Sequence, residues 1–210
     1  MKKFLALFCC LLLTSCFEIT ERIKHHDDQS GEYTLMIDFS QSWFKTKSAI
    51  WLEEVDGVKI PNEQEISQKL EDFKSKASKI DGISSITTKT DFDNYVFIIK
   101  LNYANLKALN AVVNTINNQR DQIHFSGSGK NFERIASYPI PEKVVNDPKK
   151  KKDLEEASII AIYSFDKDIL SVNNSNSKIS ANKKTVFLKQ SMYSVLKKST
   201  LMNNTIQLKP

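Results

Sequence analysis

The stretch ISSITTKTDFDNYVFIIKL, residues 83–101, decides the fold class of this chain. Its first part, 83–90, is rich in Ile and Thr, and its last part, 95–101, is aromatic and aliphatic, as expected of β-strands. Asp, Phe, Asp and Asn at 91–94 favour a turn between them. The stretch therefore predicts an antiparallel hairpin, and the segments on either side of it complete the fold.

An amphipathic helix is predicted on each side of this hairpin. Apolar residues of the first helix recur at steps of four and three, at Ile66, Leu70, Phe73, Ala77 and Ile80. That helix begins near Pro61-Asn62 and ends at Asp81-Gly82. The second helix has the same spacing, at Leu106, Leu109, Val113 and Ile116. Asn102 or Asn105 is a suitable N-cap for the second helix.

Two further strands lie outside the helices. Residues 33–39 alternate between apolar and more polar side chains, and residues 157–165 form a β-branched run. The order strand, helix, strand, strand, helix, strand matches the ferredoxin-like split βαββαβ arrangement. We therefore predict an α+β fold with two helices on one face of the sheet and a strand-rich C-terminal extension.

The same patterns divide the chain into segments. Residues 31–210 are predicted as a single α+β domain, in which 31–120 hold βαββα, 121–153 form a loop excursion, and 154–210 hold the last strands and a short helix. The short strands of the C-terminal part are expected at 169–172, 185–188 and 206–208, with the helix around Met192. The segment 40–57 has no place in the plain motif.

Composition and charge exclude several classes of protein. The chain has 210 residues, 40% of them hydrophobic and 26% charged, with 5 Gly and 5 Pro, which excludes a disordered or low-complexity protein. Its longest apolar run lies within the first 13 residues, whereas each membrane span needs ~20, so it is not a multi-span protein. Without Lys2 and Lys3, 28 basic residues face 25 acidic ones, a balance that argues against nucleic-acid binding.

The N-terminus has the features of an export signal. Lys2 and Lys3 precede an apolar stretch at 4–13, and Leu13-Thr14-Ser15-Cys16 follows directly. This tetrapeptide resembles the lipobox of bacterial lipoproteins. The resemblance implies that residues 1–15 are removed as a signal peptide, that the Cys16 thiol receives a diacylglycerol, and that the new amino terminus is acylated, for example with palmitate. An ordinary signal peptide with a chance cysteine, or an uncleaved anchor, is the alternative.

The lipobox resemblance also implies a location in the bacterial cell envelope, with the membrane as a partner through Cys16. Phe17 rather than Asp follows the cysteine, which resembles cargo sent to the outer membrane. The Lys- and Asn-rich composition is similar to that of uncharacterised lipoproteins of Bacteroidetes. Residues 17–210 contain no cysteine, so no disulfide, thiolate nucleophile or cysteine metal ligand is expected there.

Residues 16–30 are polar and charged, and we expect them to form a flexible tether between the lipid and the domain. Within this segment, His25-His26-Asp27-Asp28 provides four potential metal ligands in a row. Adjacent residues on a flexible segment do not converge on one ion without supporting contacts. We therefore interpret them as part of a charged spacer and predict no metal site.

One face of the predicted sheet is apolar where a solvent-facing surface would be polar. Val96 and Ile98 on one strand, and Ile160 and Ile162 on another, lie opposite the face that the helices cover. Such a surface needs a cover or a partner. One hypothesis is that C-terminal residues fold back over it, namely Val186, Leu188, Met192, Leu196 and Ile206. The other is that the face stays open as a binding cleft for an acyl chain or an apolar partner surface.

Catalytic motifs are scarce. Gly127-Ser128-Gly129-Lys130 resembles a phosphate-binding loop only in part, because His124 stands where that motif needs glycine, and we interpret it as a turn. His124 itself, a lone histidine, is expected to be packed rather than catalytic. A hydrolase that uses paired carboxylates is the remaining enzymatic alternative. The sequence thus favours a non-enzymatic interaction or assembly module that needs no cofactor and binds another envelope protein. The alternative is a carrier of a lipid or other hydrophobic ligand.

Overall fold

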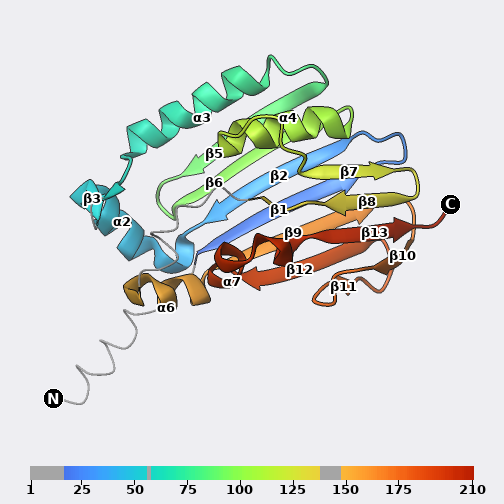
Figure 1. Ribbon diagram of the computed structural model, residues 1–210. Coiled ribbons are helices and arrows are strands. Elements are labelled where there is room, and N and C mark those ends of the chain that lie inside the picture. Colours follow the sequence, from blue (N-terminus) through green and yellow to red (C-terminus); the bar gives the residue numbers. More distant parts are fainter. Residues whose placement is uncertain (1–16, 56–57, 138–147) are drawn as a thin grey trace.

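A computed structural model describes residues 17–55, 58–137 and 148–210, and these form a mixed α+β structure as predicted (Figure 1). The strands are β1 (Glu18–His25), β2 (Gly31–Asp38), β3 (Glu54–Val55), β4 (Val58–Lys59), β5 (Ile83–Asp91), β6 (Val96–Tyr103), β7 (Phe125–Ser128), β8 (Asn131–Arg134), β9 (Ser158–Phe165), β10 (Ile169–Val172), β11 (Lys178–Ile179), β12 (Thr185–Ser191) and β13 (Asn204–Leu208). The helices are α2 (Trp43–Leu52), α3 (Glu63–Ala77), α4 (Leu106–Asn117), α6 (Pro148–Glu156) and α7 (Met192–Lys197), with 3-10 turns η1 (Ser40–Ser42) and η2 (Ser199–Met202).

The predicted hairpin and its two flanking helices are confirmed. β5 and β6 pair antiparallel, and the Asp91 side chain accepts hydrogen bonds from the backbone N–H groups of Asp93 and Asn94, both at 3.1 Å. Helix α3 begins with a capping box, in which Asn62 and Glu65 satisfy each other's backbone N–H groups. Asn105 caps α4 by accepting a hydrogen bond from the Ala108 N–H at 2.9 Å.

A seven-stranded sheet has the order β11-β12-β9-β1-β2-β6-β5. In a plain split βαβ motif the last strand, here β9, would pair directly with the first, here β2. Instead β1 lies between them, antiparallel to β2 and parallel to β9. The motif predicted from the sequence is therefore present but opened by one inserted strand.

The expectation of a tether at 16–30 is wrong, because residues of this segment form β1 in the middle of the sheet. Its inward positions alternate as Ile19, Glu21, Ile23 and His25, and the last three are buried. Two of these inward residues are polar, which hid the strand in the sequence. The polar side chains are tolerated because each finds a buried partner, Arg134 for Glu21 and Tyr103 for His25.

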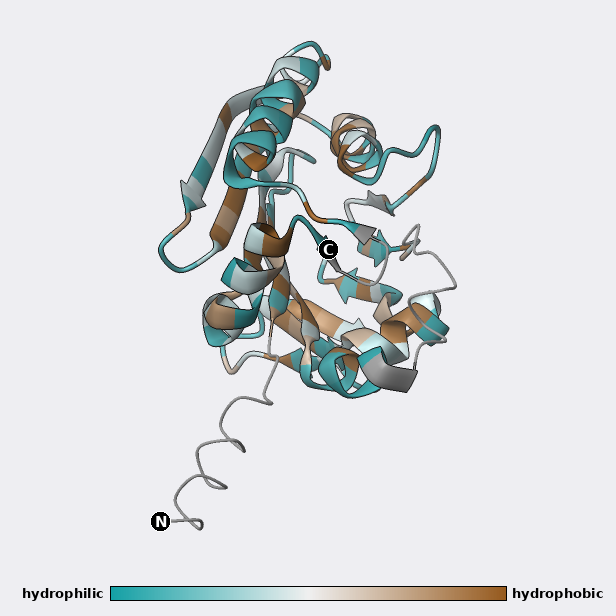
Figure 2. Ribbon diagram, turned by 90° about the vertical axis from the view of Figure 1, so that its left-hand side faces the viewer, coloured by the Kyte–Doolittle hydropathy of each residue, from teal (hydrophilic) through white to brown (hydrophobic). Residues whose placement is uncertain are grey.

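The two helices of the predicted motif lie on one face of the sheet, as expected, and Figure 2 shows them on the same side of β5 and β6. Phe73 of α3 and Leu109 and Val113 of α4 are buried in one core with Leu101 of β6. Burying these apolar side chains is the main stabilising contribution of the motif. The inward face of this half of the sheet is thus covered by helices.

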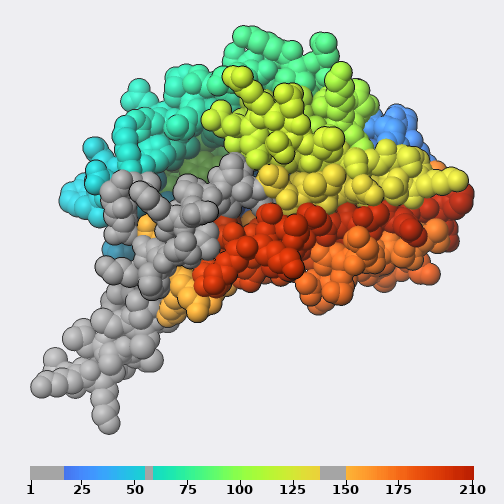
Figure 3. Space-filling view, in the orientation of Figure 1, coloured from blue at the N-terminus to red at the C-terminus, as the bar shows by residue number. Residues whose placement is uncertain are grey.

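The other half of the same face is covered by a four-stranded sheet, β10-β13-β8-β7. Phe125, Phe132 and Ile206 from this sheet are buried in one core with Tyr163 of β9. In the space-filling view the segments of this sheet, in yellow, orange and red, lie beside one another next to the yellow-green segment of α4 (Figure 3). The prediction of a loop excursion at 121–153 is therefore wrong, because the segment contains β7, β8 and the start of α6. Strands of four residues with a glycine turn between them are too short for their alternation to be recognised.

The remaining C-terminal elements follow the prediction more closely. Strands form at the three expected places as β10, β12 and β13, and α7 lies at the expected helix. The polar stretch before β12 also contributes β11, which pairs with β12 at the edge of the large sheet. The segment 40–57, which had no place in the motif, contributes η1, α2 and β3 within its described part.

Candidate functional site

The four residues predicted as ligand contacts, Val96, Ile98, Ile160 and Ile162, lie on the face of the seven-stranded sheet away from the core, here called the second sheet face. All four side chains are partly exposed. The strand register aligns Ile160, Thr20, Met36 and Ile98 in one row across four neighbouring strands. The structure thus brings the two predicted pairs to one face but separates them by β1 and β2.

Basic residues border this apolar row. The row that contains Ile98 and Ile160 reads Lys189, Ile160, Thr20, Met36, Ile98 and Lys89 from β12 to β5. The next row reads Phe187, Ile162, Arg22, Thr34, Lys100 and Thr87. These two rows contain cationic side chains and no acidic one, and the nearest carboxylate partner is Glu18, 3.5 Å from Lys189. The row on the other side reads Ser191, Ser158, Glu18, Asp38, Val96 and Asp91 and is acidic. The two central rows therefore combine apolar side chains with positive charge and lie beside a row of carboxylates.

Sequence reasoning missed the contribution of β1 to this face. Thr20 and Arg22 lie at its outward positions, between the two predicted pairs. The sequence offered only the spacing of Ile19 and Ile23, which fits one face of a strand but equally one face of a helix.

The hypothesis that the C-terminal segment folds back over the second sheet face is wrong. Val186 and Leu188 of β12 pair in register with Tyr163 and Ala161, and all four side chains are buried on the core side. Met192 and Ile206 belong to the same core, and Leu196 packs against it. The physical reason is that β9 had a free edge, and β12 fills it as a neighbouring strand. The C-terminal segment therefore extends the sheet instead of covering its second face.

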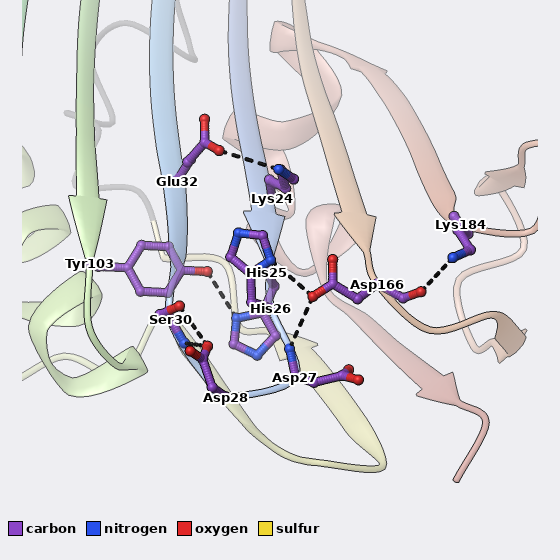
Figure 4. A network of polar contacts seen from close by, with 10 residues as sticks. All are labelled: Lys24, His25, His26, Asp27, Asp28, Ser30, Glu32, Tyr103, Asp166 and Lys184. Atoms are coloured by element: carbon purple, nitrogen blue, oxygen red, sulfur yellow. Dashed lines mark hydrogen bonds and ion pairs between the residues drawn. The ribbon is translucent and has the colours of Figure 1, made fainter.

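The residues His25 to Asp28, expected as a charged spacer, are held by three partners at the turn between β1 and β2, because His26 and the Asp27 N–H both contact Asp166 (Figure 4). His25 Nδ1 lies 2.9 Å from the Tyr103 hydroxyl, and His26 Nδ1 lies 2.9 Å from Asp166 Oδ2. The Ser30 hydroxyl donates to Asp28 Oδ1 at 2.6 Å. Burial lowers the pKa of His25, and the hydrogen bond from His26 lowers the pKa of Asp166. Because these side chains point to separate partners, they do not form one ligand cluster.

A pocket of about 440 Å³ opens beside this turn, with His26, Glu32, Asn102 and Tyr103 in its lining. Burial raises the pKa of Tyr103, so its hydroxyl stays protonated and acts as a hydrogen-bond donor or acceptor rather than as a base. The pocket has polar groups for a small ligand but no activated nucleophile among these residues.

A buried ion pair lies between the two sheets. Arg134 donates to both carboxylate oxygens of Glu21, and the Tyr163 hydroxyl donates to Glu21 Oε1 at 2.5 Å. His124 is completely buried beside them, and its Nε2 lies 3.0 Å from Asn114 Oδ1. Burial, with a smaller effect of the Arg134 charge, lowers the pKa of His124 to about 4. The expectation that His124 is packed is confirmed, and these groups join the sheets.

The glycine-containing segment at 127–130 forms the turn between β7 and β8, as expected. Asn131 Oδ1 accepts two hydrogen bonds from Ser128, one from the hydroxyl at 2.7 Å and one from the backbone N–H at 3.1 Å. A side chain at Gly127 would meet the Asn131 carbonyl at 2.5 Å, so this close approach of two strands requires glycine.

Cys16, the predicted lipid-attachment site, lies outside the described residues. Phe17, the next residue, packs against Phe39 with 5.3 Å between ring centroids and lines a pocket of about 260 Å³ with Asp38 and Gln41. In the sequence, the predicted attachment position therefore lies two residues before Glu18, where β1 begins. None of the described helices has the length and apolar character needed to cross a membrane.

Comparisons with known proteins identify no family. No family model matches the chain, and no curated protein matches it. Among solved structures, the NMR structure of the folded domain of the Mycobacterium tuberculosis LppM protein aligns with 94% of this chain and 92% of that chain. The two share 11% sequence identity, and the TM-score is 0.45.

Proposed function

We propose that this chain is a lipid-anchored, non-enzymatic protein of the bacterial envelope that binds another envelope protein through the second sheet face. The lipobox at Cys16 supports the anchor. The observation that carries the binding role is the row Ile160–Thr20–Met36–Ile98, which has a lysine at each end and lies on a face against which neither α3, α4 nor the four-stranded sheet packs. The three apolar side chains of this row are partly exposed, whereas Thr20 is buried.

The shape of this surface favours a protein partner over a carried lipid. Small ligands bind in concave sites that bury most of their surface. The apolar row instead extends over four neighbouring strands and is interrupted by Thr20. A row of this kind suits an interface with an apolar centre and a polar rim.

The charges indicate the chemistry of the partner. The apolar centre is bordered by four basic residues, Lys89, Lys100, Arg22 and Lys189. Within the described part of the chain, only Lys189 of these four has a carboxylate within 4 Å, that of Glu18. A complementary partner would carry apolar residues flanked by Asp or Glu. Such charges increase the rate of association and select the partner.

Site-specific photo-crosslinking in cells tests this proposal. A photoreactive amino acid at Ile98 and at Ile160 should crosslink to the same envelope protein, and Leu170, exposed on β10, is the control position. Lys89→Glu together with Lys100→Glu should abolish that crosslink. The purified partner should then bind the purified wild-type chain and not the variant.

Ile98→Lys separates the competing explanations. With the face open, this variant should keep a cooperative thermal unfolding transition and lose the partner. A collapsed transition would mean that the face is buried, which would contradict the proposal. Loss of a co-purifying lipid in Ile98→Lys would instead support the carrier.

A further inference from the structure

Helix α2 turns large apolar side chains outward. Trp43 is 48% exposed, Phe44 60%, Trp51 82% and Leu52 58%. At about 100° per residue, all four fall within roughly half of the helix circumference. Thr46, Ala49 and Ile50, on the other side, are only partly exposed. This is the reverse of a surface helix in a soluble domain, whose apolar side faces the core.

The helix is held in place by the domain on its inner side. Lys45 Nζ lies 3.4 Å from Asp153 Oδ1 of α6. The turn η1 precedes α2, and the Phe39 carbonyl at its start accepts a hydrogen bond from the Ser42 N–H at 2.8 Å. One ion pair and the turn η1 therefore connect α2 to the rest of the domain, while no residue of α2 is fully buried.

Helix α2 lies at the end of the molecule that carries the lipid-attachment position. Phe17 contacts Phe39, which immediately precedes η1, and Phe17 and Gln41 line the same small pocket. Figure 1 shows α2 beside the start of β1 at this end. Only Phe17 separates Cys16 from Glu18, the first residue of β1, and two extended residues span at most about 7 Å. A lipid on Cys16 would keep this end of the domain at the bilayer surface.

We propose that α2 lies in the headgroup region of the membrane that holds the lipid anchor, with Trp43, Phe44, Trp51 and Leu52 inserted. This inference rests on the anchoring part of the proposed function. Tryptophan is enriched where apolar and polar phases meet in a membrane, and short helices with an apolar side lie in the plane of that interface. Exposed Lys47 lies on the same half of the helix and can contact lipid phosphates. The bilayer, continuous with the anchor, is therefore the occupant that this surface fits.

The position of the tryptophans provides a direct test. The chain has 2 tryptophans, and both lie on α2, so tryptophan emission reports on this helix alone. The lipidated full-length protein is reconstituted into phosphatidylethanolamine–phosphatidylglycerol vesicles with brominated acyl chains. We expect a blue shift of the emission and strong quenching by bromine atoms near the headgroups.

Phe44→Lys combined with Leu52→Lys keeps both tryptophans and removes half of the apolar set. This variant should remain attached to floating vesicles through its lipid, with emission shifted back to the red and little quenching. Leu170→Lys is the matched control, because Leu170 is 55% exposed on β10, and it should behave as the wild type.

The outcomes separate the two proposals. A protein that does not float with the vesicles would contradict the lipid anchor. A protein that floats but whose tryptophans stay red-shifted and unquenched would overturn the inference about α2. A detergent-stable dimer that Phe44→Lys with Leu52→Lys dissociates would overturn it in favour of a second copy of the chain as occupant.

Discussion

Arg134 of β8 donates two hydrogen bonds to Glu21 of β1, from Nε to Oε1 at 3.0 Å and from Nη2 to Oε2 at 3.1 Å. Both side chains are almost fully shielded from solvent. This pair fixes the four-stranded sheet against the central strand of the seven-stranded sheet, and its planar geometry is the one that arginine and carboxylate groups prefer.

Glu21→Gln should lower the free energy of unfolding by about 3 kcal/mol, because it leaves the Arg134 charge buried without its partner. Urea denaturation of residues 17–210 measures this loss. Glu32→Gln is the matched control, since Glu32 pairs with Lys24 at 3.5 Å on the exposed surface and should cost less than about 1 kcal/mol. Equal losses in the two variants would show that the buried pair contributes no more than a surface pair.

The stability of the protein should fall in acid because of His124. Its pKa is about 4 in the folded chain and 6.5 in the unfolded chain, so between these values only the unfolded chain binds a proton here. The free energy of unfolding should therefore decrease as the pH falls from about 6.5 to 4, by at most about 3 kcal/mol. His124→Gln should reduce this pH dependence, and buried His25 should preserve part of it. An unchanged slope in His124→Gln would refute the assignment.

Gly31→Ala should destabilise the protein by about 1–3 kcal/mol through overpacking. A Cβ at Gly31 would collide with the Lys24 carbonyl oxygen and the Tyr103 hydroxyl on the neighbouring strands. Gly129→Ala is the control, because a Cβ there meets no atom within 4 Å, and it should change stability by less than about 0.5 kcal/mol. Thermal unfolding of both variants distinguishes a tight site from a general intolerance of glycine replacement.

Cys16→Ala should release the protein from membranes. Acyl chains contribute ~0.8 kcal/mol for each buried CH₂, so a multiply acylated anchor is effectively permanent, whereas a short interfacial helix binds reversibly. The measurement is the amount of wild-type and Cys16→Ala protein that stays in the membrane fraction after a high-salt wash and dilution. Cys9→Ala and Cys10→Ala, which change cysteines before the lipobox, should leave attachment intact. Retention of Cys16→Ala after such washing would argue against lipidation at this residue.

Local patterns in the sequence were sufficient for the elements whose stabilising contacts are local. The apolar spacing and the caps Asn62 and Asn105 located α3 and α4, and Asp91 located the hairpin turn. Strand β1 was missed because its inward Glu21 and His25 depend on Arg134 and Tyr103, which are 113 and 78 residues away. A buried polar residue is recognisable as such only when its distant partner is known.

On the second sheet face, too, locally determined features were predictable and those that depend on distant segments were not. Period-two alternation correctly assigned Ile98 and Ile160 to the face away from the helices. The destination of β12 was not predictable in this way, because Val186 and Leu188 could bury their side chains equally well on the sheet or beside it. The free edge of β9 decided between the two, and an edge is a property of the assembled sheet.

The parallel pairing of β1 with β9 has a consequence for how the chain folds. Glu18 and Ser158, which meet across this pair, are 140 residues apart. During synthesis β1 emerges before its partner strands and can form a hairpin with β2, but its other edge has no partner until β9 follows. Pairings between such distant segments are slow to form, and open strand edges associate with other chains. One edge of the first strand therefore stays unpaired until more than three quarters of the chain has been synthesised.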